Sequence, residues 1–260
     1  MTSFIDTHCH LDMLKLEANQ AVQNAQAAKV RNLVTIAVDV ASLDFVYQAV
    51  QTWMPVYGSV GIHPHEAATY TEAVGHKIRQ LAESEKKIIA IGETGLDYHY
   101  QHSPKDAQHV AFKAQLQIAE ALGLPIVLHS REAEEDTLAL LKEFPVSRKG
   151  VAHSFTGSLK MAQALVELGW FIGINGIITF KNAQDLRNVV QALPLEHLLL
   201  ETDAPFLTPV PYRGTPNDPS KIPIIAQFIA QERKISLEQL AEQTNHNAHR
   251  LFQVDAFVSS

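Results

Sequence analysis

The stretch Leu116-Gln117-Ile118-Ala119-Glu120-Ala121-Leu122-Gly123-Leu124-Pro125-Ile126-Val127-Leu128-His129 shows the pattern that decides the fold. Its first half repeats apolar residues at Leu116, Ala119 and Leu122, which predicts a helix with one buried face. The following run, Pro125–Leu128, is apolar throughout, as expected of a parallel strand that is buried on both faces. A helix that leads into such a strand is the building unit of α/β folds.

Similar runs recur along the whole chain, and longer amphipathic stretches separate them. The runs are Phe4–Asp6, Asn32–Val38, Val56–Gly61, Ile88–Gly92, Pro125–Leu128, Gly150–Ala152, Trp170–Ile174 and Leu198–Leu200. The helical patterns include Lys105–Leu122, Leu159–Leu168, Ala183–Leu193, Ile222–Glu232 and Leu237–Phe252. Eight strand–helix units in 260 residues predict an α/β fold, a (β/α)8 TIM barrel. A doubly wound open sheet is the alternative, but no Gly-rich phosphate loop follows the first run.

The stretch Pro205–Pro223 is rich in proline and lacks helical periodicity, so we expect a long loop after the eighth strand. We find no linker, low-complexity tract or convincing repeat, and therefore expect residues 1–260 to form a single domain.

Composition and charge narrow the class of protein. Hydrophobic residues make up 46% and charged residues 19%, as in ordinary globular proteins. No apolar run approaches the length of a membrane span, and no basic stretch precedes an apolar core at the N-terminus, so neither membrane attachment nor secretion is expected. The single cysteine, Cys9, excludes an internal disulfide and favours a cytoplasmic location. The net charge of −7 argues against broad attachment to nucleic acid, although bound cations could reverse the field within one pocket.

Residues able to bind metals follow the ends of five of the predicted strands. They are His8, His10, Glu93, His129, His153 and Asp203. In a (β/α)8 barrel the carboxyl ends of all strands meet at one rim, where active sites are built. We therefore expect these side chains to converge, although they are far apart in the sequence.

The first two of these residues, His8 and His10, are two positions apart on an extended segment, so both side chains point the same way. Alone, such a pair is more often structural. The suitable side chains at the other strand ends favour metal ligands. Glu93 could bridge two ions, because its two oxygens can bind separately. His129 and His153 end neighbouring strands and form a matched pair. Asp203 ends a buried strand, where an acid is costly unless it is paired or bound to metal.

Several other residues are candidates with two open interpretations. His63 is placed to touch substrate or to protonate a leaving group, or else it orients another residue, whereas His65 is expected on the loop surface. Asp97 has either a turn or a site role. Arg131 and Arg213 are the cations that could grip an anion such as phosphate, and the proline-rich loop favours Arg213. The remaining acid on the eighth strand, Glu201, could orient a histidine or form a salt bridge inside the barrel.

Taken together, the motifs resemble those of the TatD family of metal-dependent deoxyribonucleases, within the amidohydrolase-like barrels, over essentially the whole chain. They are Ile5-Asp6-Thr7-His8-Cys9-His10-Leu11-Asp12, Gly61-Ile62-His63-Pro64-His65, Gly92-Glu93-Thr94-Gly95-Leu96-Asp97-Tyr98, Leu128-His129-Ser130-Arg131, His153-Ser154-Phe155-Thr156-Gly157, Glu201-Thr202-Asp203-Ala204-Pro205 and Tyr212-Arg213-Gly214. One departure is Thr215-Pro216-Asn217-Asp218-Pro219, where many relatives carry a more basic loop.

The resemblance implies a metal-dependent hydrolase domain of the TatD type with two divalent metals. It implies that His8, His10, Glu93 and Asp203 hold one ion, and that Glu93, His129 and His153 hold the other. The implied reaction is cleavage of phosphodiester bonds in DNA by an activated water, with Asp203 and His63 as catalytic residues and Arg131 and Arg213 as substrate contacts. The ligand types suit Zn, Mn, Ni or Fe, and the carboxylates would also accept Mg.

Single-stranded ends fit a narrow rim more easily than an intact duplex, so we expect a monomeric exonuclease on such ends, without a membrane or an obligatory protein partner. Two rival functions remain open. One is an amidohydrolase, lactonase or phosphoesterase that acts on a small molecule with the same metals. The other is a binding protein without catalysis on a retained barrel.

Overall fold

The computed structural model describes residues 2–257 and contains eight parallel strands, each paired with the next in chain order. The strands are β1 (Phe4–Cys9), β2 (Val30–Ile36), β3 (Val56–Val60), β4 (Ile88–Asp97), β5 (Ile126–Arg131), β6 (Gly150–Ala152), β7 (Phe171–Ile174) and β8 (Leu198–Leu200). The α-helices are α1 (Ala18–Ala27), α2 (Val40–Thr52), α3 (Glu72–Ser84), α4 (Lys105–Leu122), α5 (Glu134–Glu143), α6 (Leu159–Glu167), α7 (Gln184–Ala192), α8 (Ile222–Arg233) and α9 (Leu237–Phe252). Short 3-10 helices are η1 (Pro64–Thr69), η2 (Gly176–Thr179), η3 (Leu195–His197), η4 (Pro219–Lys221) and η5 (Asp255–Phe257).

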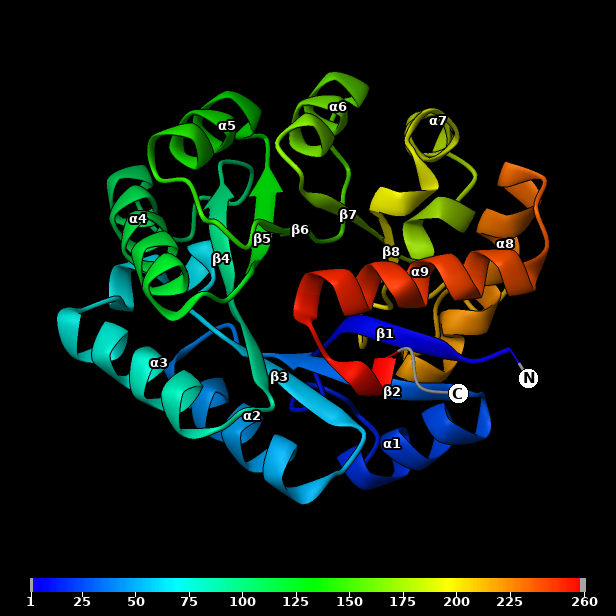
Figure 1. Cartoon of the computed structure of the whole chain (residues 1–260), viewed down its shortest axis with the longest axis horizontal. Helices are drawn as coiled ribbons and strands as arrows, with labels where there is room; N and C mark the ends of the chain where they lie inside the picture. The colour runs from blue at the N-terminus through cyan, green and yellow to red at the C-terminus, as the bar shows by residue number, and fades with distance from the viewer. Residues whose placement is uncertain (1, 258–260) are drawn as a thin grey trace.

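The helices surround the strands (Figure 1), and the predicted (β/α)8 barrel is confirmed. The ring is nearly closed where β8 leads back to β1. A parallel bridge joins Cys9 to Ala204 there, and the backbone N–H of Asp203 donates to the His8 carbonyl at 2.9 Å. This closure brings the end of the first strand directly beside the segment that carries the last predicted metal ligand.

Three strands continue further than their apolar runs predict. β1 includes His8, β4 runs on to Asp97, and β5 runs on to Arg131. The ladder between β4 and β5 pairs Gly95 with His129, so polar residues at the rim keep strand geometry. Glu93 and His129 therefore lie within strands rather than after them, because backbone pairing does not depend on apolar side chains.

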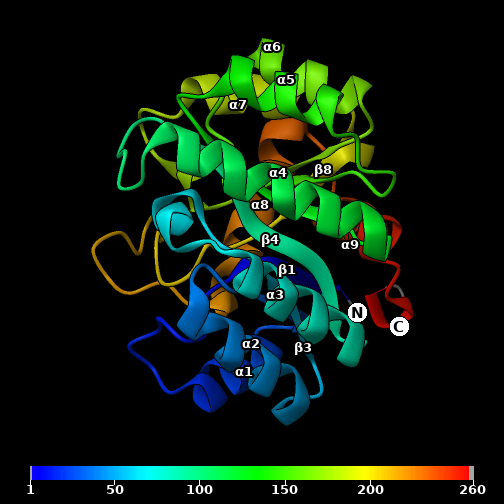
Figure 2. The same ribbon diagram turned by 90° about the vertical axis from the view of Figure 1, so that its left-hand side faces the viewer.

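The barrel interior at the start of the strands is filled by apolar side chains. Ile5, Ile89 and Leu199 pack there with Phe252 of α9 and with Phe257, which is fully buried. The end of the described chain thus covers this opening. In Figure 2, α9 and the chain ends lie on the right, and the loops that follow the strands lie on the left.

The loops on the opposite side include the predicted long loop, which occupies residues 201–218 without α-helix before η4 begins. Asn217 anchors it from within, because its buried side chain donates to the carbonyls of Thr202 at 3.0 Å and of Phe206 at 2.7 Å. Between residues 2 and 257, no helix combines the length and apolar character that crossing a bilayer requires.

Candidate active site

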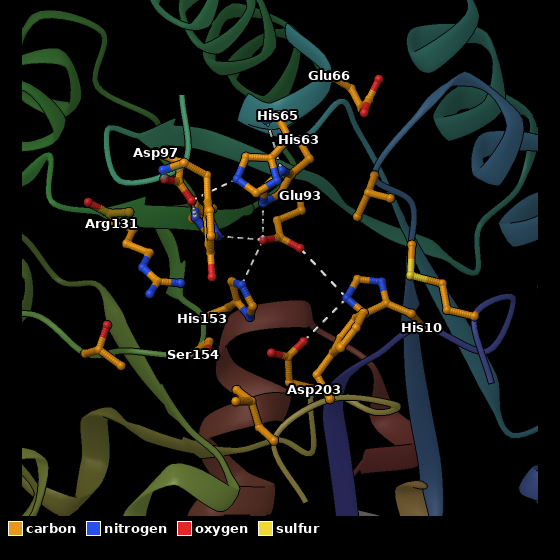
Figure 3. Close-up of a pocket in the computed structure, with 18 of the residues that line it drawn as sticks. His10, His63, His65, Glu66, Glu93, Asp97, Arg131, His153, Ser154 and Asp203 are labelled. Atoms are coloured by element: carbon orange, nitrogen blue, oxygen red, sulfur yellow. Dashed lines mark hydrogen bonds and ion pairs between the residues drawn. The ribbon is translucent and has the colours of Figure 1, made fainter. Parts of the chain in front are cut away.

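A cavity of about 720 Å³ opens at the rim formed by the carboxyl ends of the strands. Figure 3 shows Glu93 near its centre, with His63 and His153 on one side and His10 and Asp203 on the other. These side chains come from the ends of β1, β3, β4, β6 and β8 and the segments that follow them. The convergence expected from strand ends is therefore present.

The His8 and His10 imidazoles meet through their Nε2 atoms, which are 3.2 Å apart and buried. The His10 Nδ1 lies 3.1 Å from the Ile36 carbonyl oxygen, which accepts its proton. A neutral ring that donates at Nδ1 has a free lone pair on Nε2. Asp203 completes the group, with Oδ1 at 3.4 Å from His10 Nε2 and 3.7 Å from His8 Nε2. These three side chains could hold a metal ion.

Glu93 stands between this group and a second set of histidines. Its Oε1 lies 2.8 Å from His153 Nε2, 2.9 Å from His129 Nδ1 and 3.3 Å from His63 Nε2. Its Oε2 faces the other way and lies 3.4 Å from His8 Nε2. The two oxygens thus face two different sets of nitrogen atoms, which is the arrangement a bridging carboxylate needs.

The charges of the site follow from burial and from these contacts. Burial opposes ionisation of Glu93, but the charges of His153 and His63 and hydrogen bonds from His129 and His153 hold its pKa well below the usual range. Burial lowers the pKa of His8, and it lowers the pKa of His63 to about 4. Both rings are therefore neutral at pH 7, as an imidazole that binds a metal ion must be.

The sequence left open whether Asp97 holds a turn or belongs to the site. Its carboxylate holds the turn after β4 and also lies in the cavity wall beside His129. It is fully buried, and its Oδ1 accepts from the backbone N–H groups of His99 and Tyr100 at 3.0 and 2.9 Å. Its Oδ2 accepts from His129 Nε2 at 3.0 Å and from His65 Nε2 at 2.9 Å. In the neutral form of the His129 ring, a proton held on Nε2 leaves the Nδ1 lone pair free for a metal ion beside Glu93.

The expectation that His65 lies on the loop surface is wrong, since this side chain bonds Asp97 and lines the cavity. The sequence held no signal for this position, because His65 lies in the 3-10 helix η1 with His63 at its N-cap, and strand alternation does not set its direction.

His63 differs from His10 and His129 in its tautomer, because its proton lies on the nitrogen that faces the cavity. Its Nδ1 accepts from the backbone N–H of His65 at 3.1 Å, so the neutral ring carries its proton on Nε2. That nitrogen points at Glu93 Oε1 and lines the cavity as a donor. A protonated nitrogen offers no lone pair to a metal ion.

Beneath the histidines lies Glu201, which is fully buried. Its Oε1 accepts from the backbone N–H of Ser154 at 2.5 Å and lies 3.7 Å from His153 Nδ1. Besides His8, His10 and Asp203, two groups have ligand atoms that lie close together: His63 with Glu93 and His129, and His8 with His153 and Glu201. The position of Glu201 agrees with a role in orienting His153, one of the two interpretations that the sequence leaves open.

The two arginines take different places. Arg131 lines the cavity and holds its guanidinium 4.7 Å from the centre of the Tyr100 ring. Arg213 is exposed, lies outside the cavity lining and stacks on Phe180 at 4.0 Å. The sequence favoured Arg213 because it lies in the proline-rich loop, yet the structure brings Arg131 to the site.

Cys9 alternates away from the two histidines, as strand geometry requires. It is fully buried, and burial raises the pKa of its thiol well above the usual value. This side chain is consequently a poor nucleophile.

Comparison with known proteins identifies the family. The model of the family described as TatD related DNase matches residues 5–253. The chain is 37% identical to the uncharacterized metal-dependent hydrolase YabD of Bacillus subtilis, covering 96% of this chain and 99% of that protein. It is 36% identical to the uncharacterized metal-dependent hydrolase YcfH of Escherichia coli, covering 97% and 96%.

Solved structures agree with these matches. The crystal structure of the TatD homolog YJJV from Escherichia coli superposes with a TM-score of 0.92 at 32% identity, covering 96% of this chain and 98% of that one. A TatD family hydrolase from Entamoeba histolytica shares the fold with a TM-score of 0.87 at 22% identity, covering 96% and 98%. The chain belongs to the TatD family of metal-dependent hydrolases.

Proposed function

We propose that this chain is a hydrolase with two divalent metal ions, bridged by Glu93. His8, His10, Asp203 and Glu93 would hold one ion, and Glu93, His129 and His153 would hold the other. The observation that carries the proposal is the opposite orientation of the two Glu93 oxygens, each within 3.4 Å of an imidazole nitrogen. Two buried imidazole nitrogens 3.2 Å apart, the Nε2 atoms of His8 and His10, fit a shared cation.

The donor set suits Zn, Mn, Ni or Fe, and the carboxylates also accept Mg. When bound, such ions lower the pKa of a water toward neutrality and neutralise the charge that builds on the substrate. Asp203 is the proton acceptor in this proposal. Burial opposes its ionisation, but His10, His153 and His8 hold its pKa below the usual value, so it is a carboxylate at pH 7. His63 donates its Nε2 proton in a hydrogen bond to the substrate or to the leaving oxygen.

The proposed substrate is the phosphodiester bond of DNA, and the proposed action is exonucleolytic on single-stranded ends. The family description supports DNA, and Arg131 supports an anionic group at the cavity wall. Arg213 is exposed on the loop beside the cavity. We propose that it contacts the part of the DNA strand that lies outside the cavity.

An end-labelled single-stranded oligonucleotide, incubated with the purified enzyme whose metal content has been measured, tests this function. We expect one-nucleotide steps that stop on chelation, and loss of cleavage in Glu93→Ala and His129→Ala. His76→Ala is the matched control, because His76 is exposed on α3 and should leave cleavage unchanged. Absence of metal-dependent cleavage of any DNA would refute the nuclease.

A small-molecule hydrolase is the second candidate, and one observation favours it. Among the described residues that line the cavity, Arg131 is the single lysine or arginine, and the whole chain carries a net charge of −7. A long polyanion usually meets more cations than this. Lactones, amides and simple phosphodiesters, assayed beside single-stranded DNA, separate the two functions.

A further inference from the structure

The cavity around the metal-competent residues has two walls of different chemistry. One wall comes from the segments after β3 and β4 and from the last residues of β4 and β5, and contains His65, Glu66, Asp97, Tyr100 and Arg131. The other comes from the segments after β1, β2, β7 and β8, and its apolar members are Met13, Val38, Ile177, Phe206 and Leu207. Asp39 also lies on this side, but its carboxylate is occupied by the N–H and hydroxyl of Ser42 at the start of α2. The cavity is therefore polar on one side, where Arg131 lies among the acids Glu66 and Asp97, and largely apolar on the other.

The apolar wall is dominated by Phe206, whose ring is 51% exposed. Met13 beside the same cavity is 37% exposed. A single exposed apolar side chain is common on protein surfaces, but several that line one cavity indicate a ligand-facing surface. The Phe206 ring centre lies 6.2 Å from that of His10, so this wall directly adjoins the metal-competent group.

Both backbone groups of Phe206, its N–H and its carbonyl, are hydrogen-bonded. Its N–H donates to the Asp203 carbonyl at 2.8 Å, and its own carbonyl accepts from the buried amide of Asn217 at 2.7 Å. The next residue, Leu207, packs so closely on the β7 segment that a Cβ at Gly176 would collide with its carbonyl oxygen. An exposed aromatic ring on an anchored backbone is a preformed surface for a flat ligand.

We propose that Phe206 is the stacking platform for an unpaired nucleobase of the substrate. This inference rests on the proposed phosphodiesterase function. It assigns a binding surface to the base, which is the part of the nucleotide that the proposed metal ligands do not touch. The base lies on the apolar wall, its phosphate lies at the Glu93 centre, and the neighbouring phosphate reaches Arg131 on the opposite wall. A base in a duplex already stacks on its neighbours, so this platform selects single-stranded ends.

The test uses the intact metal-loaded enzyme and two probes, thymidine 5′-monophosphate and 2-deoxyribose 5-phosphate, which differ only by the base. Isothermal titration calorimetry gives the Kd of each, and chromatography gives the KM for cleavage of oligothymidylate. Since aromatic stacking of one base changes affinity by about 5- to 150-fold, Phe206→Ala should weaken the mononucleotide by a factor in this range. It should leave the Kd of the sugar phosphate unchanged, and Phe206→Trp should keep mononucleotide binding.

Tyr212→Ala is the matched control, because Tyr212 lies in the same loop, is 47% exposed and is outside the cavity lining. Equal weakening of both probes in Phe206→Ala, or no weakening of either, overturns the inference. So does a wild-type enzyme that binds the mononucleotide no more tightly than the sugar phosphate. Wild-type binding that depends on Phe206, together with no cleavage of oligothymidylate, supports the platform and refutes the nuclease.

Discussion

Replacing Asp97 by asparagine changes one atom of a fully buried side chain. The change should weaken metal binding through His129, whose ring Asp97 holds by a hydrogen bond. Oδ1 of Asp97 accepts two backbone N–H groups, so the asparagine oxygen will keep that position. Its NH2 group then faces His129 Nε2 and His65 Nε2, which are 3.0 and 2.9 Å from the present Oδ2. An NH2 group cannot accept a proton, and His129 must turn its own proton onto Nδ1.

The size of the effect follows from that change of tautomer. Nδ1 is the atom that lies 2.9 Å from Glu93, and once protonated it has no lone pair for an ion. Removing a carboxylate that orients a ligating histidine costs about 10- to 100-fold in metal affinity, or about 1.4–2.8 kcal/mol. We expect the Kd of one of the two ions to rise by this factor, while the other ion binds normally.

Competition with a chromophoric chelator measures both constants, and circular dichroism checks the fold. Asp218→Asn is the matched control, because Asp218 is a part-buried carboxylate that likewise accepts a backbone N–H, and it pairs with a lysine outside the cavity lining. Wild-type affinity for both ions in a correctly folded Asp97→Asn protein would refute the tautomer argument.

Three further predictions concern stability. Phe257→Ala should lower the free energy of unfolding in urea by about 3–5 kcal/mol, because it removes a fully buried ring that covers the start of the barrel strands. The control Met54→Ala, at an 89% exposed residue, should leave the free energy of unfolding almost unchanged. A loss under 1 kcal/mol for Phe257→Ala would contradict the packing. Burial raises the pKa of Asp6 to about 8, so the folded carboxyl keeps its proton between about pH 4 and pH 8 and the unfolded one does not. Stability should therefore fall as pH rises through this window, and Asp6→Asn should flatten that dependence while the exposed Asp44→Asn does not. Removing metal with a chelator should lower Tm, and adding metal back should restore it, because ligand binding stabilises only the folded state. Glu93→Gln should abolish most of this recovery of Tm. An unchanged Tm after complete metal removal would argue against the two-ion site.

How far the sequence could predict the site depended on the kind of residue. His8, Glu93 and Asp203 were found because strand ends of a barrel share one rim, whatever the loops do. His65 was misplaced, because a histidine after a strand looks the same whether its partner is water or Asp97. Arg131 and Arg213 could not be ranked, since long side chains reach several positions and their aromatic partners, Tyr100 and Phe180, lie on other elements.

The sequence by itself determined the eight strand–helix units and the set of residues that converge, because hydrophobic periodicity and strand direction are local properties of the chain. Only the tertiary structure decided which nitrogen of His10, His63 and His129 points inward. That choice depends on the partner of the other nitrogen, and the partners are Ile36 for His10, the His65 backbone for His63 and Asp97 for His129. The contact of His10 joins the segment after β1 to β2, and that of His129 joins β5 to β4, so their geometry exists only once these neighbouring strands have paired.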